Sequence, residues 1–99
     1  MSARPTLADV FARSDDVVGR RVAGEYVLVP LFGRGIAADA IYTLNRVATV
    51  VWESLDGRRD GEAVVGLLIQ TFDVDRDTAA RDFLELVEAL EDIGALRRM

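Results

Sequence analysis

The sequence predicts an α+β domain in which a three-stranded antiparallel sheet is followed by three helices. Two runs rich in β-branched residues, Val17 to Val22 and Glu25 to Leu31, are separated only by Ala23 and Gly24, which is typical of a β-hairpin. A third short apolar run, residues 40–44, follows after a loop over residues 32–39. Because short links favour antiparallel neighbours, these three runs predict a meander.

Each of the three helices has a residue at its start that is suited to capping it. Asn45, Asp60 and Asp75 carry side-chain oxygens that can accept hydrogen bonds from the free amides of a first turn. Asp56-Gly57 is expected to end the first helix and Gly94 the third, since glycine adopts the left-handed conformation without strain. Apolar residues recur at helical spacing in all three segments.

Length and composition fit a single domain without the common catalytic groups. The 99 residues suffice for one modest core, and we divide them into a flexible N-terminal arm, residues 1–16, and a folded domain, residues 17–99. The absence of cysteine and histidine removes thiolate nucleophiles, zinc sites and imidazole acid–base chemistry, and no cofactor is expected. The lack of a disulfide framework and of an apolar leader predicts a cytoplasmic protein.

Charge is concentrated in the third predicted helix. The segment from Asp75 to Ile93 contains seven acidic residues and two arginines, so it alone has a net charge of −5, the same as the whole chain. Such a helix would repel a phosphate backbone, which argues against DNA binding. Clustered carboxylates could also bind a metal ion, but without histidine and on a polar helix face they indicate a solvated surface.

The third helix has more apolar surface than a surface helix of this length needs. One stripe, which includes Ala79, Phe83 and Leu86, is the expected core face. A second stripe lies beside it and contains Ala80, Leu84 and Val87. This second stripe is covered either by another part of the domain, such as the third strand or the N-terminal arm, or by a ligand.

Three further features have structural interpretations that we prefer to functional ones. Gly33-Arg34-Gly35 lacks the third glycine of a phosphate-binding motif and predicts a flexible loop. Trp52, the single tryptophan, has apolar helical neighbours and is expected in the core and not as a stacking platform. Asp82 lies at the border of the apolar arc, and we expect a structural ion pair with Arg46 or Arg58.

Spaced landmarks over residues 17–96 resemble the PqqD-like family. The matching stretches are Tyr42-Thr43-Leu44-Asn45, Val51-Trp52-Glu53-Ser54-Leu55-Asp56-Gly57, Phe72-Asp73-Val74, Asp82-Phe83-Leu84, Leu90 and Gly94-Ala95-Leu96. The resemblance implies a winged-helix-like fold. It also implies a non-catalytic recognition element that binds the leader of a ribosomally synthesised precursor peptide.

In this family the leader adds as a strand beside the third strand, in the groove between that strand and the third helix. The domain then presents it to a modifying enzyme, such as a radical S-adenosylmethionine (SAM) protein, or to a leader peptidase, in pathways that make pyrroloquinoline quinone, lasso peptides or related products. Carried over to this chain, the peptide-binding residues are Ala40, Ile41, Tyr42, Thr43, Leu44, Ala80, Leu84, Val87 and Glu88. Glu88 and Glu91 are further hypothesised to attract a basic residue of the leader.

The third strand supports the same site on physical grounds. If it is the edge of the sheet, its free amides and carbonyls form a template for an added strand. The rival interpretation is a structural interaction module that docks on a protein, or on a second copy of itself, through the same edge. Such a homodimer should be dissociated by leader peptide.

Overall fold

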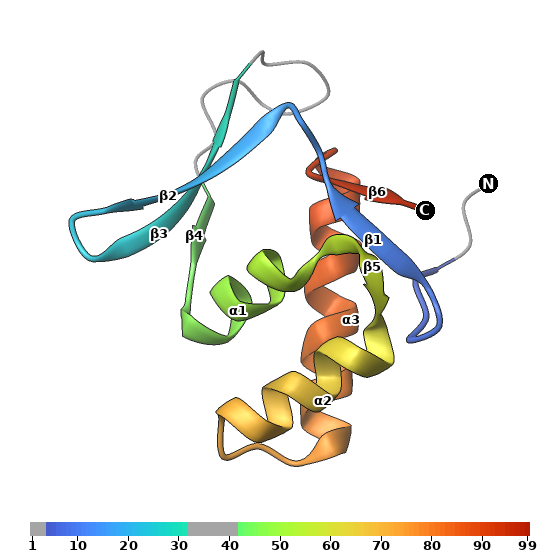
Figure 1. The fold of residues 1–99 in the computed structure, drawn as a ribbon. Helices are drawn as coiled ribbons and strands as arrows, with labels where there is room; N and C mark the ends of the chain where they lie inside the picture. Colours follow the sequence, from blue (N-terminus) through green and yellow to red (C-terminus); the bar gives the residue numbers. More distant parts are fainter. Residues whose placement is uncertain (1–3, 32–41) are drawn as a thin grey trace.

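The computed structural model describes residues 4–31 and 42–99, which form two three-stranded sheets and three helices (Figure 1). In chain order the elements are β1 (Val10–Arg13), β2 (Val17–Val22), β3 (Glu25–Pro30), β4 (Tyr42–Leu44), α1 (Arg46–Ser54), β5 (Asp56–Asp60), α2 (Gly61–Thr71), α3 (Arg76–Asp92) and β6 (Leu96–Arg98). The α+β prediction is confirmed. The order of elements differs from the prediction, because β1 precedes the expected meander, β5 separates α1 from α2, and β6 follows α3.

The predicted meander is present as the sheet β2-β3-β4, all antiparallel. Val22 pairs with Glu25 across a two-residue turn. Ala23 and Gly24 both have positive φ, 52° and 83°, which is the geometry of the tight turn that matches the twist of a hairpin. The expected third strand is β4; its predicted first residues, 40 and 41, and the predicted loop over 32–39 lie outside the described residues.

All three predicted helix caps are confirmed. The side chains of Asn45, Asp60 and Asp75 accept from first-turn amides at 2.8, 2.9 and 2.7 Å. Gly94 has a φ of 78° directly after the cap of α3, as the sequence indicates, whereas α1 ends earlier than expected, at Ser54 with Leu55 as its cap, and Gly57, with a φ of 80°, lies within β5. No helix in the described part of the chain is both long and apolar enough to cross a bilayer.

The second sheet, β5-β1-β6, was not expected from the sequence. Its central strand is β1, which pairs antiparallel with β5 on one side and with β6 on the other. Phe11 of β1 is 1% exposed and belongs to the core. The expected flexible arm over residues 1–16 is therefore wrong for Val10–Arg13, which form the middle of a sheet.

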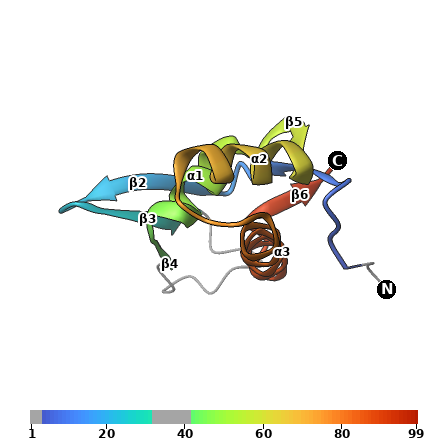
Figure 2. The same cartoon turned by 90° about the horizontal axis from the view of Figure 1, so that it is seen from below.

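Residues just before β1 are also part of the fold. The first amides of α2 donate to this segment, Gly61 N–H to the Asp9 carbonyl at 3.2 Å and Glu62 N–H to the Leu7 carbonyl at 3.0 Å. These bonds satisfy amides that a helix leaves without partners at its N-terminus. The segment thus caps α2 from outside, and it runs along one side of α3 (Figure 2).

The core lies between the helices and the two sheets. Its largest fully buried side chains are Phe11, Leu28, Val51, Leu55, Val64, Val65, Leu68, Phe83 and Val87. Trp52 is 2% exposed and packs in the same cluster, which confirms its predicted place in the core.

Candidate functional site

β4 is the outer strand of the sheet β2-β3-β4. One side pairs with β3, where Thr43 stands opposite Val27, and among the described residues no strand pairs with the other side. Tyr42 is 38% exposed and Thr43 is exposed, whereas Leu44 is buried. The strand is therefore fixed to the core at its end and open along its outer edge.

The hairpin determines which backbone groups of β4 point outward. In a two-residue hairpin the residues that flank the turn, here Val22 and Glu25, exchange hydrogen bonds, and every second residue along the ladder does the same. Val27 consequently directs its N–H and C=O toward β2. Its partner Thr43 must direct its own N–H and C=O away from β3. Thr43 thus offers one donor and one acceptor to an added strand.

A depression of about 360 Å³ begins where β4 ends and lies between α1 and α3. Its lining residues are Asn45, Val47, Ala48, Val51, Asp82, Phe83, Glu85 and Leu86. Val51 and Phe83 are each 1% exposed, whereas Val47 and Leu86 are half-buried and open to the depression. Apolar surface that is only half covered is suited to receiving an apolar side chain.

Two carboxylates border this depression. Asp82 and Glu85 are both exposed, and neither forms an ion pair within residues 4–31 and 42–99. The expected pairing of Asp82 with Arg46 or Arg58 is therefore not formed. Arg46 instead lies over the ring of Phe72, with its guanidinium carbon 5.8 Å from the centroid.

The acids further along α3 already have partners. Glu88 accepts from Arg4 at 3.1 Å, and Glu91 accepts from Arg98 at 2.8 Å. The first pair is exposed and contributes roughly 0 to 1 kcal/mol. The hypothesis that Glu88 and Glu91 attract a basic leader residue stays a prediction, and it now requires both pairs to open.

Of the second apolar stripe of α3, Leu84 lies on the flank of the helix away from β4. Leu84 and Glu88 line a different depression together with Arg4 and Pro5. Figure 2, which looks along α3, shows β4 on one side of the helix and the N-terminal segment on the other. Leu84 thus lies beside the N-terminal segment and still lines a depression of about 450 Å³.

The structure accordingly divides the predicted peptide-binding set. Tyr42 and Thr43 lie on the open edge, and Ala40 and Ile41 lie outside the described residues. Ala80 is half-buried against the core. Val87 is fully buried, so its predicted place in the wall of an open groove needs correction. It contacts the core on the side of α3 that packs inward.

Sequence reasoning did not predict that Val47 and Leu86 line the depression beside β4. Leu86 had been assigned to the core stripe, since periodicity marks it as apolar but does not show which flank of the helix stays open. A usable signal was Asn45: a helix capped directly after an edge strand places its first turn, with Val47, beside that edge. The predicted Gly33-Arg34-Gly35 loop lies outside the described residues. Within the described ranges, no three acidic side chains gather to hold a metal ion.

Comparisons with known proteins agree with this architecture. The family model described as coenzyme PQQ synthesis protein D (PqqD) matches residues 25–96. A solved structure described as TbiB1 in complex with the TbiA(beta) leader peptide has a TM-score of 0.71 and 27% identity, covering 87% of this chain and 94% of that one. Another, described as lasso peptide synthetase B1 complexed with the leader peptide, has a TM-score of 0.73 and 21% identity, covering 88% and 96%. No curated protein matches the chain.

Proposed function

The chain belongs to the PqqD family, and from this premise we propose that it is a non-catalytic domain that binds the leader of a ribosomally synthesised precursor peptide. The leader adds as a strand to the outer edge of β4 and places an apolar side chain in the depression between α1 and α3. The observation that carries the proposal is the outward-facing backbone of Thr43, two residues before Asn45, which lines that depression. The similarity to TbiB1, whose structure contains a leader peptide, supports the same ligand class.

Strand addition alone supplies little net affinity. Each backbone hydrogen bond contributes about 0.5 to 1.5 kcal/mol, while ordering each peptide residue costs about 1 to 2 kcal/mol. Burying one apolar side chain adds roughly 1.5 to 3 kcal/mol. Affinity therefore depends on anchors in the depression, where Leu86 and Val47 offer half-covered apolar surface.

The bound leader is then presented to a separate enzyme, a radical SAM protein or a leader peptidase. A chain without cysteine or histidine has few groups for chemistry of its own, which supports a presenting role. A short precursor gene beside a transglutaminase-like peptidase would assign this chain to a lasso-type pathway, and one beside a radical enzyme to a pathway like that of pyrroloquinoline quinone.

An amide NMR titration tests the proposal. The ¹⁵N-labelled chain is titrated with the leader half of the short precursor encoded next to it, and a peptide of scrambled sequence is the control. We expect shifts that gather at residues 42–44 and at Asp82, Glu85 and Leu86, with none from the scrambled peptide. An unchanged spectrum at millimolar leader would refute leader binding for this precursor.

The same edge could instead pair with β4 of a second copy, because an open strand edge is a template for any strand. Sedimentation velocity separates the two functions. A dimer that leader peptide does not dissociate would favour self-association, whereas a monomer that binds leader supports the proposed function.

A further inference from the structure

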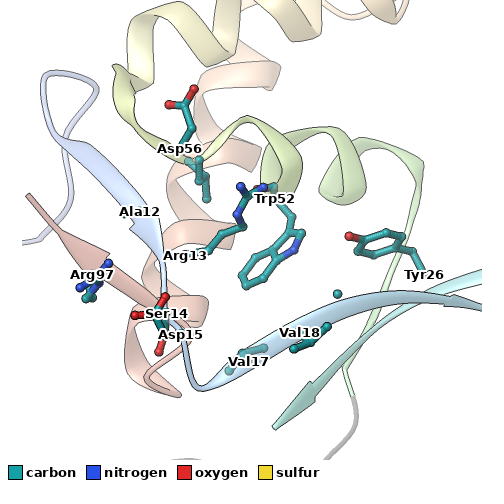
Figure 3. Close-up of a pocket in the computed structure, with 12 residues that line it drawn as sticks. Ala12, Arg13, Ser14, Asp15, Val17, Val18, Tyr26, Trp52, Asp56 and Arg97 are labelled. Atoms are coloured by element: carbon teal, nitrogen blue, oxygen red, sulfur yellow. The ribbon is translucent and has the colours of Figure 1, made fainter. Parts of the chain in front are cut away.

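A second depression, of about 540 Å³, lies between the sheet edge and the last turns of α1 (Figure 3). It is lined by Ala12, Arg13, Ser14, Asp15, Val17, Val18, Gly19, Tyr26, Trp52, Leu55, Asp56 and Arg97. It shares no lining residue with the depression beside β4. Both can therefore be occupied at the same time.

The indole N–H of Trp52 is available to a ligand in this depression. The side chain is 2% exposed, and within the described residues its N–H donates to no acceptor. No fully buried side-chain nitrogen or oxygen among those residues lacks a partner, so this N–H must retain contact with the open space. A strong donor that is nearly buried and unpaired favours an incoming acceptor.

A second donor lies beside it because residue 19 is glycine. A β-carbon at Gly19 would stand 2.7 Å from Trp52 Nε1 and closer still to Tyr26 Oη, so both polar atoms occupy the space that a side chain would fill. Figure 3 shows the indole nitrogen and the phenol oxygen directed toward one another. Tyr26 is held there by Arg21, whose guanidinium carbon lies 5.7 Å from the ring centroid.

Charged groups at the border add further donors. Arg13 and Arg97 line the depression, and Arg13 also donates to the carbonyls of Trp52 and Glu53 at 3.3 and 3.2 Å, which ties β1 to the end of α1. One of the two border acids, Asp56, is engaged, since its carboxylate accepts from the amides of residues 58 and 59 at 3.0 and 3.2 Å. Within the described residues, the lining groups that remain without a partner are the donors of Trp52, Tyr26 and Arg97 and one carboxylate, that of Asp15, so donors outnumber acceptors and an anionic acceptor complements them.

We propose that this depression binds a carboxylate side chain, an Asp or Glu on the surface of the enzyme that acts on the leader-bound precursor. The inference rests on the proposed function, because a domain that presents a peptide must contact the enzyme through a surface that the peptide leaves free. The carboxylate accepts from Trp52 Nε1–H and Tyr26 Oη–H, and Arg97 adds a positive charge at the border.

The single tryptophan gives a direct test, since the chain has one indole N–H resonance. N-acetyl-glutamate N-methylamide, whose single charge is the side-chain carboxylate, serves as the probe, and N-acetyl-glutamine N-methylamide is the uncharged control, both titrated at neutral pH. We expect a saturable downfield shift of the indole proton with the glutamate compound only. An indole resonance that stays in place, or that responds equally to both compounds, would overturn the inference.

The two tyrosines of the chain supply a matched pair of variants. Tyr26→Phe removes one donor and should weaken probe binding about tenfold, the usual effect of losing a hydrogen bond to a charged group. Tyr42→Phe alters the hydroxyl on β4 and should leave probe binding unchanged. Equal probe affinity in both variants would reject the donor pair.

Leader binding and processing by the enzyme are then assayed with Tyr26→Phe and with the wild type. Tyr26→Phe should retain leader affinity while it slows processing of the precursor by the modifying enzyme encoded beside this chain. Processing at the rate of the wild type would overturn the partner contact. If the wild type itself does not bind leader, that result counts against the proposed function. Failure of the proposed function and failure of the partner contact are therefore distinguishable.

Discussion

Thr43 lies directly opposite Val27 in the β3–β4 ladder, in a pair whose N–H and C=O groups point away from each other. The outward groups of Thr43 are the only backbone hydrogen-bonding groups within Tyr42–Leu44 that an added strand can reach without opening the sheet, because Tyr42 and Leu44 direct theirs toward β3.

This geometry makes proline at residue 43 a specific probe. Thr43→Pro deletes the outward N–H and leaves the β3–β4 ladder intact, since an edge strand tolerates proline where its N–H faces away from the sheet. The leader carbonyl that would accept from this N–H is then left unpaired, which should weaken leader binding about tenfold. Thr43→Ala keeps the N–H and is the control. Calorimetric titration in which both variants bind equally would contradict strand addition at this edge.

Two leucines on opposite flanks of α3 test where the apolar anchor lies. Leu86 lines the depression beside β4 and Leu84 lines the depression beside Arg4 and Pro5, and both are half-buried against the core. Leu86→Ala should weaken leader binding about tenfold through lost apolar contact. Leu84→Ala should change leader affinity less than about twofold, although it should lower the free energy of unfolding about as much as Leu86→Ala does. If Leu84→Ala weakened leader binding more than Leu86→Ala does, the peptide groove would lie at the stripe that contains Ala80 and Leu84.

The two glycines of α2 predict opposite changes in stability. A β-carbon at Gly61 would lie 2.8 Å from both the Leu7 Cα and the Phe83 ring, so Gly61→Ala should lower the free energy of unfolding by roughly 1 to 3 kcal/mol. A β-carbon at Gly66 would meet nothing within 4 Å, so Gly66→Ala should raise it by about 0.5 to 1 kcal/mol. Urea unfolding measures both. A neutral Gly61→Ala would mean that the N-terminal segment is not packed on α2.

Stability should fall in acid partly because of the cap of α3. The pKa of Asp75 is held below its usual value mainly by the hydrogen bonds that its carboxylate accepts from the amide and the hydroxyl of Thr78. A lowered folded-state pKa means that the ionised form stabilises the fold. This contribution is complete above the unfolded-state pKa, about 3.9, and is lost as pH falls through the folded-state value.

Asp75→Asn keeps a capping oxygen but cannot titrate. Wild type should therefore be the more stable of the two at pH 6, and the difference in unfolding temperature should shrink between about pH 4 and pH 2. Thermal unfolding followed by circular dichroism measures it. A difference that is unchanged at pH 2.5 would show that Asp75 contributes nothing to the acid sensitivity.

The site was only partly predictable from the sequence. The edge strand was found, because a hairpin followed by a third strand leaves that strand outermost in a meander. The flank of α3 that faces it was not found. Leu84 and Leu86 both border the core stripe of the helix, and periodicity treats the two flanks alike. Both leucines are half-buried and line separate depressions, and only the arrangement of the elements shows that the depression lined by Leu86 begins at the end of β4.

Local features of the sequence determined the hairpin turn at Ala23 and Gly24, the three helix caps and the helix stop at Gly94. Each depends on hydrogen bonds or backbone angles among residues that are close in the sequence, so it can be predicted without the tertiary structure. Tertiary structure alone decided that β1 becomes the centre of a second sheet. Its partners β5 and β6 are far away in the sequence and nearly devoid of apolar pattern, so their pairing arises from the packing of the whole chain.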